Sequence, residues 1–443
     1  MGFQTLFFIF GFFPLVFISQ YFFKDIKKRN IGLVIFSLIF YGWANLSHIG
    51  VLLLSIAWNY LTGLVMERSE KKKTIVTSGI VVDLLVLMAF KYSHFFFGIQ
   101  PTSIPIGLSF FTFSEISYLM DVYAKRCPAS HDLLNYTLYV SYFGKISMGP
   151  IVDYHQMVDA CKDRSIQWSN IGKGSILFLK GLVKKVVLAD SLALAFHSLQ
   201  TTSSFFGAWL LTFTYTLQIY FDFSGYSDMA IGLSEMLGFH FEPNFRHPYM
   251  ASSIQDFWRR WHISLSTWFR DYLYIPLGGN RSHYIRNIGI VWFCTGLWHG
   301  ANWTFIVWGL YYGSLLLLEH YYLKPVLKNH PLGSHIYTFV LVMIGWVFFF
   351  STDLSQAFHI LTLMIPFGHV PWITGMDAFI FHSHWVVYVA SIFFMLPFWD
   401  HVEHVCIHRY NTWWMVGLYG LSFLLCICMM VGSTYQTFLY AAF

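Results

Sequence analysis

The chain has 443 residues, of which 56% are hydrophobic, 21% are aromatic and only 11% are charged. A soluble globular domain carries about 25% charged residues, so this composition excludes that class of protein. The formal net charge is +5, and the cationic loops that anchor a membrane protein account for it without a nucleic-acid partner.

Apolar runs recur along the whole chain and predict an all-α polytopic membrane protein. A helix needs about 20 apolar residues to cross the hydrocarbon core. A β-barrel would show short segments of alternating polarity, unlike the continuous runs at residues 31–41 and 421–431. The apolar runs cover residues 3–23, 31–46, 48–66, 75–97, 104–120, 133–151, 174–197, 205–221, 288–298, 301–323, 336–350, 384–399 and 412–432. We predict that residues 1–443 form a single membrane-embedded domain.

The first run, residues 3–23, is predicted to be a retained span with the N-terminus outside the cell. No positive residue precedes it, whereas a secretory signal peptide begins with positive charge. Cations mark the cytoplasmic side of a membrane, and four follow this run, namely Lys24, Lys27, Lys28 and Arg29. Two further apolar runs return the chain to a second cationic loop at residues 67–73, which agrees with this orientation.

Several runs are too short for ordinary spans, so we expect re-entrant or interfacial segments among them. Non-helical backbone at membrane depth survives only where protein or a cavity surrounds it. The segment 101–113, with Pro105 and Gly107 in an apolar setting, is one candidate. Many transporters consist of internal repeats, and the sequence shows none, which weakens the interpretation as a transporter.

The middle of the chain, residues 221–286, is its most charged stretch and is expected to leave the lipid or to build a polar site within it. Its charged residues include Asp222, Asp228, Glu242, Arg246, Asp256, Arg259, Arg260, Arg270, Asp271, Arg281 and Arg286. Residues 254–272 also have a helical period of apolar side chains. That stripe consists of Ile254, Trp258, Trp261, Leu265, Trp268 and Tyr272. We predict one continuous amphipathic helix at the cytoplasmic interface, with His262 facing inward.

His299, in the apolar run GLWHGANW, is the leading candidate for chemistry. An ionisable side chain at membrane depth costs about 2.5 kcal/mol or more and by default marks a functional site, and histidine titrates near neutral pH. Gly296 and Gly300 allow close approach of a backbone or a ligand. Trp298 and Trp303 offer flat walls for an acyl chain or an acceptor. The alternative is a buried histidine that is hydrogen-bonded to a carbonyl and serves packing alone.

A second histidine, two arginines and two acids are further candidates. His262 lies in WRRWHISLS, and a position on the border of an interfacial helix explains it as well as a chemical role does. Arg259 and Arg260 are candidates to bind the phosphates of a nucleotide-bearing donor, although arginines at this interface also serve orientation alone. Asp222 and Asp228 either orient a histidine, line an acceptor path or pair with the arginines, and the sequence leaves these roles open.

We predict no metal and no permanently bound cofactor. His401, His404 and His408 have the helical spacings of three and four that suit a metal site. They lie between two apolar runs, however, where solvated histidines are ordinary, and no HExxH motif occurs. The six cysteines form no CxxC pair and are predicted to be buried thiols. The lack of a GxSxG elbow and of a P-loop gives no support to that type of hydrolase or to an ATP-driven pump.

Three segments resemble the membrane-bound O-acyltransferases, and most closely their alginate O-acetyltransferase branch. They are FDFSGYSDMAIG at residues 221–232, QDFWRRWHISLSTWFRDYLYIPLGGNR at 255–281 and GLWHGANWTFIVWG at 296–309. The resemblance is densest over a catalytic core at about residues 215–310 and extends more loosely on both sides. The end of the chain, YQTFLYAAF, departs from the aromatic ending of that branch.

This resemblance implies a ring of tilted helices around a central funnel, in the plasma membrane of a bacterium. It implies that His299 is the essential residue and His262 a second active-site histidine. Family members move an acyl group from a thioester donor to a hydroxyl, so acetyl-CoA is the expected donor. In the bacterial branch the acetyl group crosses the membrane to an extracytoplasmic acetyltransferase or similar partner, which completes transfer to a polysaccharide.

Our hypothesis is that His299 takes the proton of an acceptor hydroxyl as that hydroxyl attacks the thioester, since a placed base contributes about 10²–10⁴-fold. His262, Asn302 or a backbone amide would stabilise the oxyanion, or His262 would orient the acceptor. A covalent acyl-histidine relay is the alternative mechanism. The alternative functions are D-alanyl transfer from a carrier protein to lipoteichoic acid, a transporter without bond chemistry, and a structural scaffold.

Overall fold

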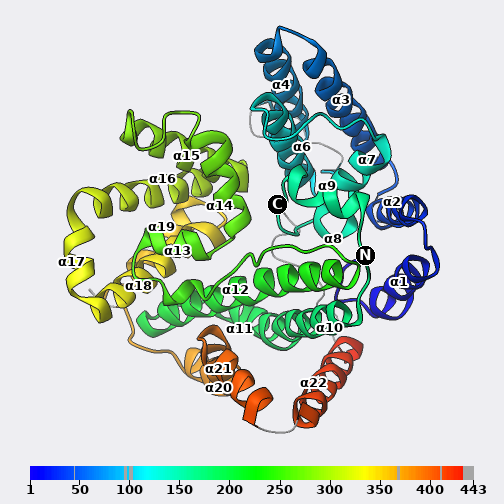
Figure 1. The fold of residues 1–443 in the computed structure, drawn as a ribbon. Coiled ribbons are helices and arrows are strands. Elements are labelled where there is room, and N and C mark those ends of the chain that lie inside the picture. The colour runs from blue at the N-terminus through cyan, green and yellow to red at the C-terminus, as the bar shows by residue number, and fades with distance from the viewer. Residues whose placement is uncertain (44, 94–96, 99–102, 367–369, 410–411, 433–443) are drawn as a thin grey trace. The chain divides into compact units, whose positions relative to one another are not determined.

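A computed structural model describes residues 1–43, 45–93, 97–98, 103–366, 370–409 and 412–432, and helices are the regular secondary structure throughout them (Figure 1). Five helices in this part of the chain are long and apolar enough to cross a membrane. They are α3 (His48–Arg68), α4 (Lys72–Lys91), α18 (Pro331–Phe350), α20 (Gly375–Met395) and α22 (Thr412–Gly432). The prediction of an all-α polytopic membrane protein is therefore confirmed. The final segment, YQTFLYAAF, lies outside the described residues.

The chain forms two compact units. The first comprises Met1–Phe178, Tyr226–Pro243 and Arg270–Tyr272, and the second comprises Leu179–Gly225, Asn244–Phe269 and the chain from Leu273 onward. The long helix α12 (Phe205–Met236) contributes to both. The single domain expected over residues 1–443 stays a prediction.

The first unit is built mostly from the N-terminal helices, which are coloured blue to cyan in Figure 1. Besides α3 and α4 they are α1 (Phe13–Phe22), α2 (Ile26–Gly42), α6 (Leu108–Tyr123), α7 (Leu133–Ser141), α8 (Phe143–Ile146), α9 (Tyr154–Lys162) and most of α10 (Trp168–Val183). Carboxylates cap two of these helices, since Asp25 accepts from the Lys27 amide and Asp132 from the Leu134 amide. The segment expected to be re-entrant, 101–113, lies partly outside the described residues, and its end forms the buried start of α6.

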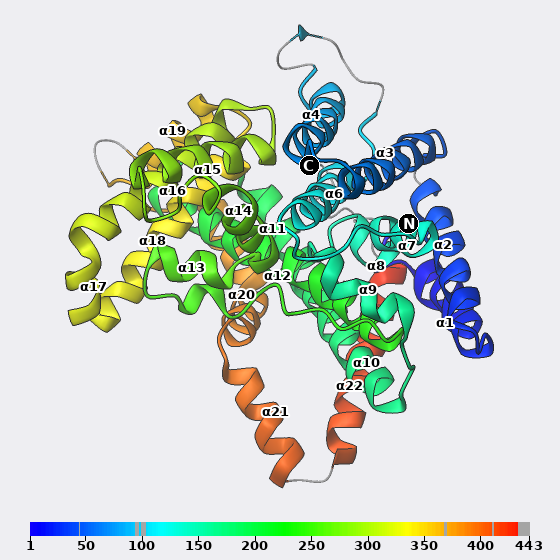
Figure 2. The ribbon, with the colours of Figure 1, turned by 45° about the horizontal axis from the view of Figure 1, so that its top comes forward.

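The second unit holds the helices that carry the candidate site. Besides α18, α20 and α22 they are α11 (Asp190–Leu199), α13 (Ile254–Arg260), α14 (Ile263–Phe269), α15 (Tyr284–His299), α16 (Trp303–Leu318), α17 (Lys324–Asn329), α19 (Leu354–Leu363) and α21 (Phe398–Arg409). Helix α16 packs against both α15 and α18, and the three remain neighbours when the view is tilted (Figure 2).

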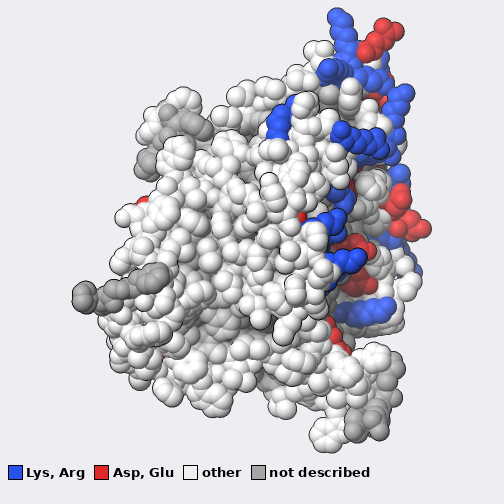
Figure 3. All heavy atoms as spheres, turned by 90° about the vertical axis from the view of Figure 1, so that its left-hand side faces the viewer, with Lys and Arg blue, Asp and Glu red and all other residues white. Residues whose placement is uncertain are grey.

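The surface of the molecule suits a lipid environment. Figure 3 shows one face, on which Lys, Arg, Asp and Glu gather along one border and leave a broad uncharged remainder. The apolar helices expose large side chains such as Leu54, Phe379 and Leu421. Exposed apolar surface on this scale is rare in soluble proteins and marks contact with lipid or protein.

The predicted continuous amphipathic helix over residues 254–272 is wrong, because the chain there forms two short helices with a break between them. Helix α13 ends at Arg260, Trp261 is extended, and His262 has a φ of 42° before α14 begins. The Asn244 carbonyl accepts from the Ile263 amide at 2.9 Å, and the Asn244 side chain accepts from the Ser264 amide at 3.0 Å. These bonds to another segment replace intrahelical ones, so the helix breaks and turns the His262 side chain into the protein, where it is buried as expected.

Two glycines allow α15 and α16 to approach backbone to backbone. A Cβ added at Gly296 would meet the carbonyl oxygen of Phe305, and one added at Gly309 would meet that of Trp292. Small residues at such contacts are the usual means by which membrane helices pack closely. The expected role of Gly296 in close backbone approach is therefore confirmed, and the contact fixes the end of α15, where His299 lies.

The Gly309→Ala variant is expected to lower the apparent melting temperature of the purified protein in detergent. Its methyl group would meet the Trp292 carbonyl, and overpacking of this kind costs about 1–3 kcal/mol. Gly289→Ala on α15 is the matched control, because a Cβ there meets nothing within 4 Å. Equal melting temperatures for Gly309→Ala and the unmodified protein would show that the two helices do not pack through this glycine.

Candidate active site

His299 is the last residue of α15, and three helices surround its ring. It is only 3% exposed. Its ring centroid lies 4.8 Å from that of Trp308 on α16 and 4.9 Å from that of Phe349 on α18, both in edge-to-face geometry. After His299 the chain turns at Gly300, where a Cβ would meet the Phe305 ring. The imidazole is thus held by aromatic rings, which favour one orientation of the ring.

Trp298 links the two histidines expected to be functional. Its ring lies 4.7 Å from His299 and 6.3 Å from His262. All three residues belong to the second unit and are buried. The structure therefore brings together His262, Trp298 and His299, although their separation in the sequence is large, and their chemical roles stay predictions.

The surroundings of His262 fix its charge and its tautomer. Burial lowers the pKa of His262 to about 3, so the ring is neutral at physiological pH. Its Nδ1 lies 3.3 Å from the Asn244 side-chain oxygen, which also accepts from the Ser264 amide. An oxygen in that position accepts only, so Nδ1 carries the hydrogen and Nε2 presents a lone pair. This Nε2 is buried and has no hydrogen-bond partner among the described residues.

Asn302 and Trp303 occupy positions that are mainly structural. The Asn302 side-chain oxygen accepts from the Thr304 amide at 3.1 Å and so caps α16. Its amide nitrogen donates to the Thr352 carbonyl at 2.8 Å. Trp303, the first residue of α16, is 61% exposed, in contrast to the buried Trp298. Both ends of the Asn302 side chain are therefore engaged already.

Arg259 and Arg260, the two candidate phosphate-binding arginines, have different surroundings. Arg259 is exposed on α13. Arg260 donates from Nε to Asp256 at 2.9 Å, one turn earlier on the same helix. Contact of either arginine with a phosphate remains a prediction.

Asp222 forms a buried ion pair with a residue that sequence analysis missed. The Lys185 ammonium lies 2.7 Å from Asp222 and 2.7 Å from Asp190, and it is 1% exposed. A lysine inside the apolar run 174–197 was the available signal. Asp228 lies further along α12, in the first unit.

A second missed residue, Glu319, holds the start of α13. Its carboxylate accepts from the amides of Ile254 and Gln255 at 2.6 and 3.2 Å. A negative charge at a helix N-terminus satisfies amides that lack intrahelical partners. Glu319 is the one acid in the apolar run 301–323, which was the signal that pointed to it.

Of the histidines around residue 400, those whose side chains the structure describes form no metal site. The described residues contain no group of three or more histidines, cysteines or acids that would hold an ion, and the side chain of His408 lies outside them. The Asp400 carboxylate lies 2.8 Å from Nε2 of His247, and Glu403 forms an ion pair with Lys180.

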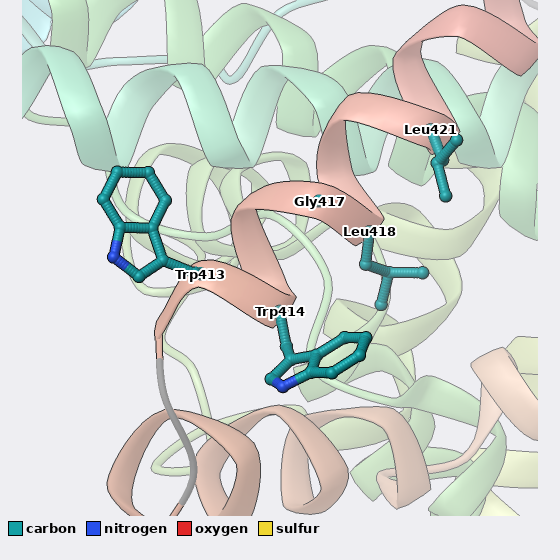
Figure 4. Close-up of a pocket in the computed structure, with 5 residues that line it drawn as sticks. All are labelled: Trp413, Trp414, Gly417, Leu418 and Leu421. Atoms are coloured by element: carbon teal, nitrogen blue, oxygen red, sulfur yellow. The ribbon is translucent and has the colours of Figure 1, made fainter.

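A hollow on α22 is another surface feature of this unit (Figure 4). It is lined by Trp413, Trp414, Gly417, Leu418 and Leu421. These side chains include no acid, base or nucleophile, so the hollow supplies no group for acyl transfer. The buried histidine pair remains the candidate site.

The helical membrane fold encloses a buried histidine pair, and comparisons with known proteins identify the class of protein. The chain belongs to the membrane-bound O-acyltransferase (MBOAT) family, whose sequence profile matches residues 35–357. The protein is therefore a membrane O-acyltransferase.

The names of the relatives state that they act on alginate, peptidoglycan or teichoic acid. The chain is 40% identical over 393 residues to the probable alginate O-acetylase AlgI of Azotobacter vinelandii, covering 83% of this chain and 79% of the relative. It is 36% identical to the peptidoglycan O-acetyltransferase of Helicobacter pylori, covering 83% and 80%. It is 27% identical to the teichoic acid D-alanyltransferase of Bacillus subtilis, covering 71% and 85%. The resemblance to the alginate branch is thereby confirmed.

Proposed function

We propose that this protein transfers an acetyl group from a cytoplasmic thioester, acetyl-CoA, towards a hydroxyl of a cell-surface polysaccharide. The observation that carries the proposal is the pair of buried histidines, His262 and His299, whose rings both lie near that of Trp298. The O-acetylating relatives in Azotobacter and Helicobacter support acetyl as the group transferred.

In the proposed reaction His299 acts as the general base. The acceptor oxygen attacks the thioester carbonyl carbon while the His299 imidazole takes the hydroxyl proton. As the new C–O bond forms and the C–S bond breaks, the sulfur leaves as a thiolate and receives that proton from the imidazolium. No net proton is released, and no external reductant or oxidant is needed. A base placed in this way contributes about 10²–10⁴-fold.

His262 orients the acceptor in this scheme. A neutral ring whose Nδ1 donates to Asn244 leaves Nε2 as a hydrogen-bond acceptor for a second hydroxyl of the acceptor, since the hydrogen of the attacking hydroxyl goes to His299. The same tautomer has no hydrogen to offer an oxyanion, so oxyanion stabilisation falls to a backbone amide. The engaged Asn302 side chain is less suited to that role than the sequence suggested.

The proposal includes a location and a partner. We place the protein in the bacterial plasma membrane with its N-terminus outside, because the cationic stretch from Lys24 to Arg29 follows the first apolar helix. The acetyl group is then passed to an extracytoplasmic acetyltransferase or a similar polysaccharide-modifying partner. In this orientation the thioester donor binds from the cytoplasm. Arg259 and Arg260 are proposed to contact the phosphates of that donor.

D-alanyl transfer from a carrier protein to lipoteichoic acid is the second candidate function. The likeness to the Bacillus D-alanyltransferase supports it, at lower identity than the likeness to the acetylating relatives. Transport without bond making is a third candidate, in which the histidines line a pathway.

Membrane vesicles separate these candidates. Inside-out vesicles that contain the protein are expected to consume acetyl-CoA labelled in its acetyl group, to release free thiol and to hold acid-stable label on polymer or partner protein. Right-side-out vesicles should not respond, because the donor site faces the cytoplasm. Vesicles without the protein are the control. Label from a D-alanyl carrier protein alone would establish the second candidate, and movement of label without thiol release would establish transport.

A further inference from the structure

The first unit contains two buried carboxyl groups that the proposed reaction does not use. Glu115 on α6 is 0% exposed and Asp83 on α4 is 3% exposed. The two groups are close enough to interact electrostatically. Ionisable residues in membrane helices are costly and are functional candidates by default.

One cation, Lys145, interacts with Glu115. The Lys145 ammonium on α8 also donates to the Ser114 hydroxyl at 3.1 Å and lies 4.3 Å from the centre of the Tyr139 ring. Lys145 is 3% exposed. A single ammonium balances one carboxylate, so the second carboxyl group must be neutral or must bind a further positive charge.

Several acceptor oxygens in and around the two acids have no hydrogen-bond donor. Ser55 donates to one Glu115 oxygen at 2.6 Å, and Asn59 donates to one Asp83 oxygen at 2.8 Å. The other oxygens of these side chains, Glu115 Oε1, Asp83 Oδ2 and Asn59 Oδ1, are buried without a hydrogen-bond partner. Asn59, which is 0% exposed, turns towards Asp83 and leaves its own oxygen unsatisfied. All three atoms are acceptors, so a hydrogen is what the cluster lacks.

Two hydroxyls complete the surroundings. Tyr41 on α2 and Tyr136 on α7 both interact electrostatically with Glu115, and their hydroxyl oxygens are buried without a hydrogen-bond partner. Neither therefore donates the hydrogen that Glu115 Oε1 lacks. The groups that contact or interact with the two acids are thus Lys145, one serine, one asparagine and two tyrosines, and Lys145 also interacts with Asp153.

We propose that Asp83 and Glu115 form a proton-binding site inside the first unit, in which the two carboxyl groups hold one proton between them. Ionising both members of a buried pair of interacting carboxyl groups is unfavourable, and the usual result is a pair that shares a proton. With Lys145 the set is then electrically neutral. The ligand is the proton, and the pair titrates as a unit.

Carbodiimide labelling tests this site on the intact protein in detergent. N,N′-dicyclohexylcarbodiimide reacts with protonated carboxyl groups in apolar surroundings, and mass spectrometry of peptides locates the adduct. We expect one adduct per chain, on Asp83 or Glu115, with a labelling rate that falls as the pH rises from about 5 to about 9. No adduct on either residue at any pH would overturn the proposal.

Single variants distinguish a shared proton from two independent acids. Asp83→Asn and Glu115→Gln each remove the neighbouring carboxylate whose charge opposes ionisation, so the remaining acid ionises and its labelling should fall severalfold. Lys145→Met removes the balancing charge and should extend labelling to higher pH. Labelling of the remaining acid that is as fast as in the unmodified protein would contradict the shared proton. Size-exclusion elution confirms that each variant is folded.

Asp377→Asn is the matched control. Asp377 on α20 is also buried, but its carboxylate accepts hydrogen bonds from Thr202, Ser204 and Thr374. Asp377 should therefore not be labelled, and its replacement should leave the labelling of Asp83 and Glu115 unchanged. Sodium ion supplies the last test. Excess sodium at constant pH should leave the labelling rate unchanged, and protection by sodium would show that the site binds a metal cation rather than a proton.

Discussion

Replacing His299 with phenylalanine is expected to leave the protein folded and to remove polymer-linked acetate from cells. Phenylalanine keeps an aromatic ring against Trp308 and Phe349 but has no nitrogen to take a proton. The expected loss is about 10²–10⁴-fold in transfer rate, which is the contribution of a positioned general base. Acetate released from purified polymer by mild alkali measures the effect, with membrane levels matched by blotting.

The phenylalanine variant is more informative than His299→Ala, which also removes the ring. Since the ring packs among aromatic side chains, alanine would lower activity through a cavity even if His299 had no chemical role. Normal acetate in cells with His299→Phe would show that the residue only packs and would favour transport or another site. His359→Ala on α19 is the matched control, because that histidine is exposed and its loss should change nothing.

Sequence analysis could predict the membrane class and select His299 as a candidate because both depend on local pattern. A histidine in an apolar run is visible in one stretch of sequence, and span length follows from the thickness of the membrane. The chain segment around Trp261 and His262 shows where this reasoning fails. Its apolar period is helical, but amides of Ile263 and Ser264 bond to Asn244 rather than to the preceding turn. A bond to a distant residue leaves no periodic signal.

The polar partners in the interior were also beyond local pattern. Asp222 was expected to orient a histidine, to line an acceptor path or to pair with an arginine, and its carboxylate pairs with Lys185 from a different helix. Asn302 was expected near the oxyanion, and its place at the start of α16 makes it a helix cap. Both outcomes depend on which helices become neighbours. The same holds for the Asp83 and Glu115 pair, whose members are 32 positions apart in sequence (115 minus 83).

Replacing Lys185 with methionine should destabilise the protein strongly. Methionine fills the space of the lysine stem but leaves Asp222, whose side chain is 3% exposed, and Asp190, at 14%, without the ammonium 2.7 Å away from each. Removing one partner of a buried ion pair costs about 3–5 kcal/mol, because the remaining charge is uncompensated. We expect a lower apparent melting temperature and a smaller monodisperse peak in size-exclusion chromatography after mild heating.

The triple variant Lys185→Met, Asp190→Asn and Asp222→Asn shows whether charge is the cause. It removes the ammonium together with both carboxylates, so no uncompensated charge stays buried, and much of the lost stability should return. Lys173→Met, at an exposed position on α10, should have little effect, since exposed charges contribute little to stability. Two results would show that the ion pairs do not hold α11 and α12 in place. One is an equal melting temperature for Lys185→Met and the unmodified protein, and the other is a triple variant no more stable than the single one. Recovery of stability in the triple variant would instead mean that Asp222 stabilises the fold. The buried histidines would then remain the candidates for the chemistry.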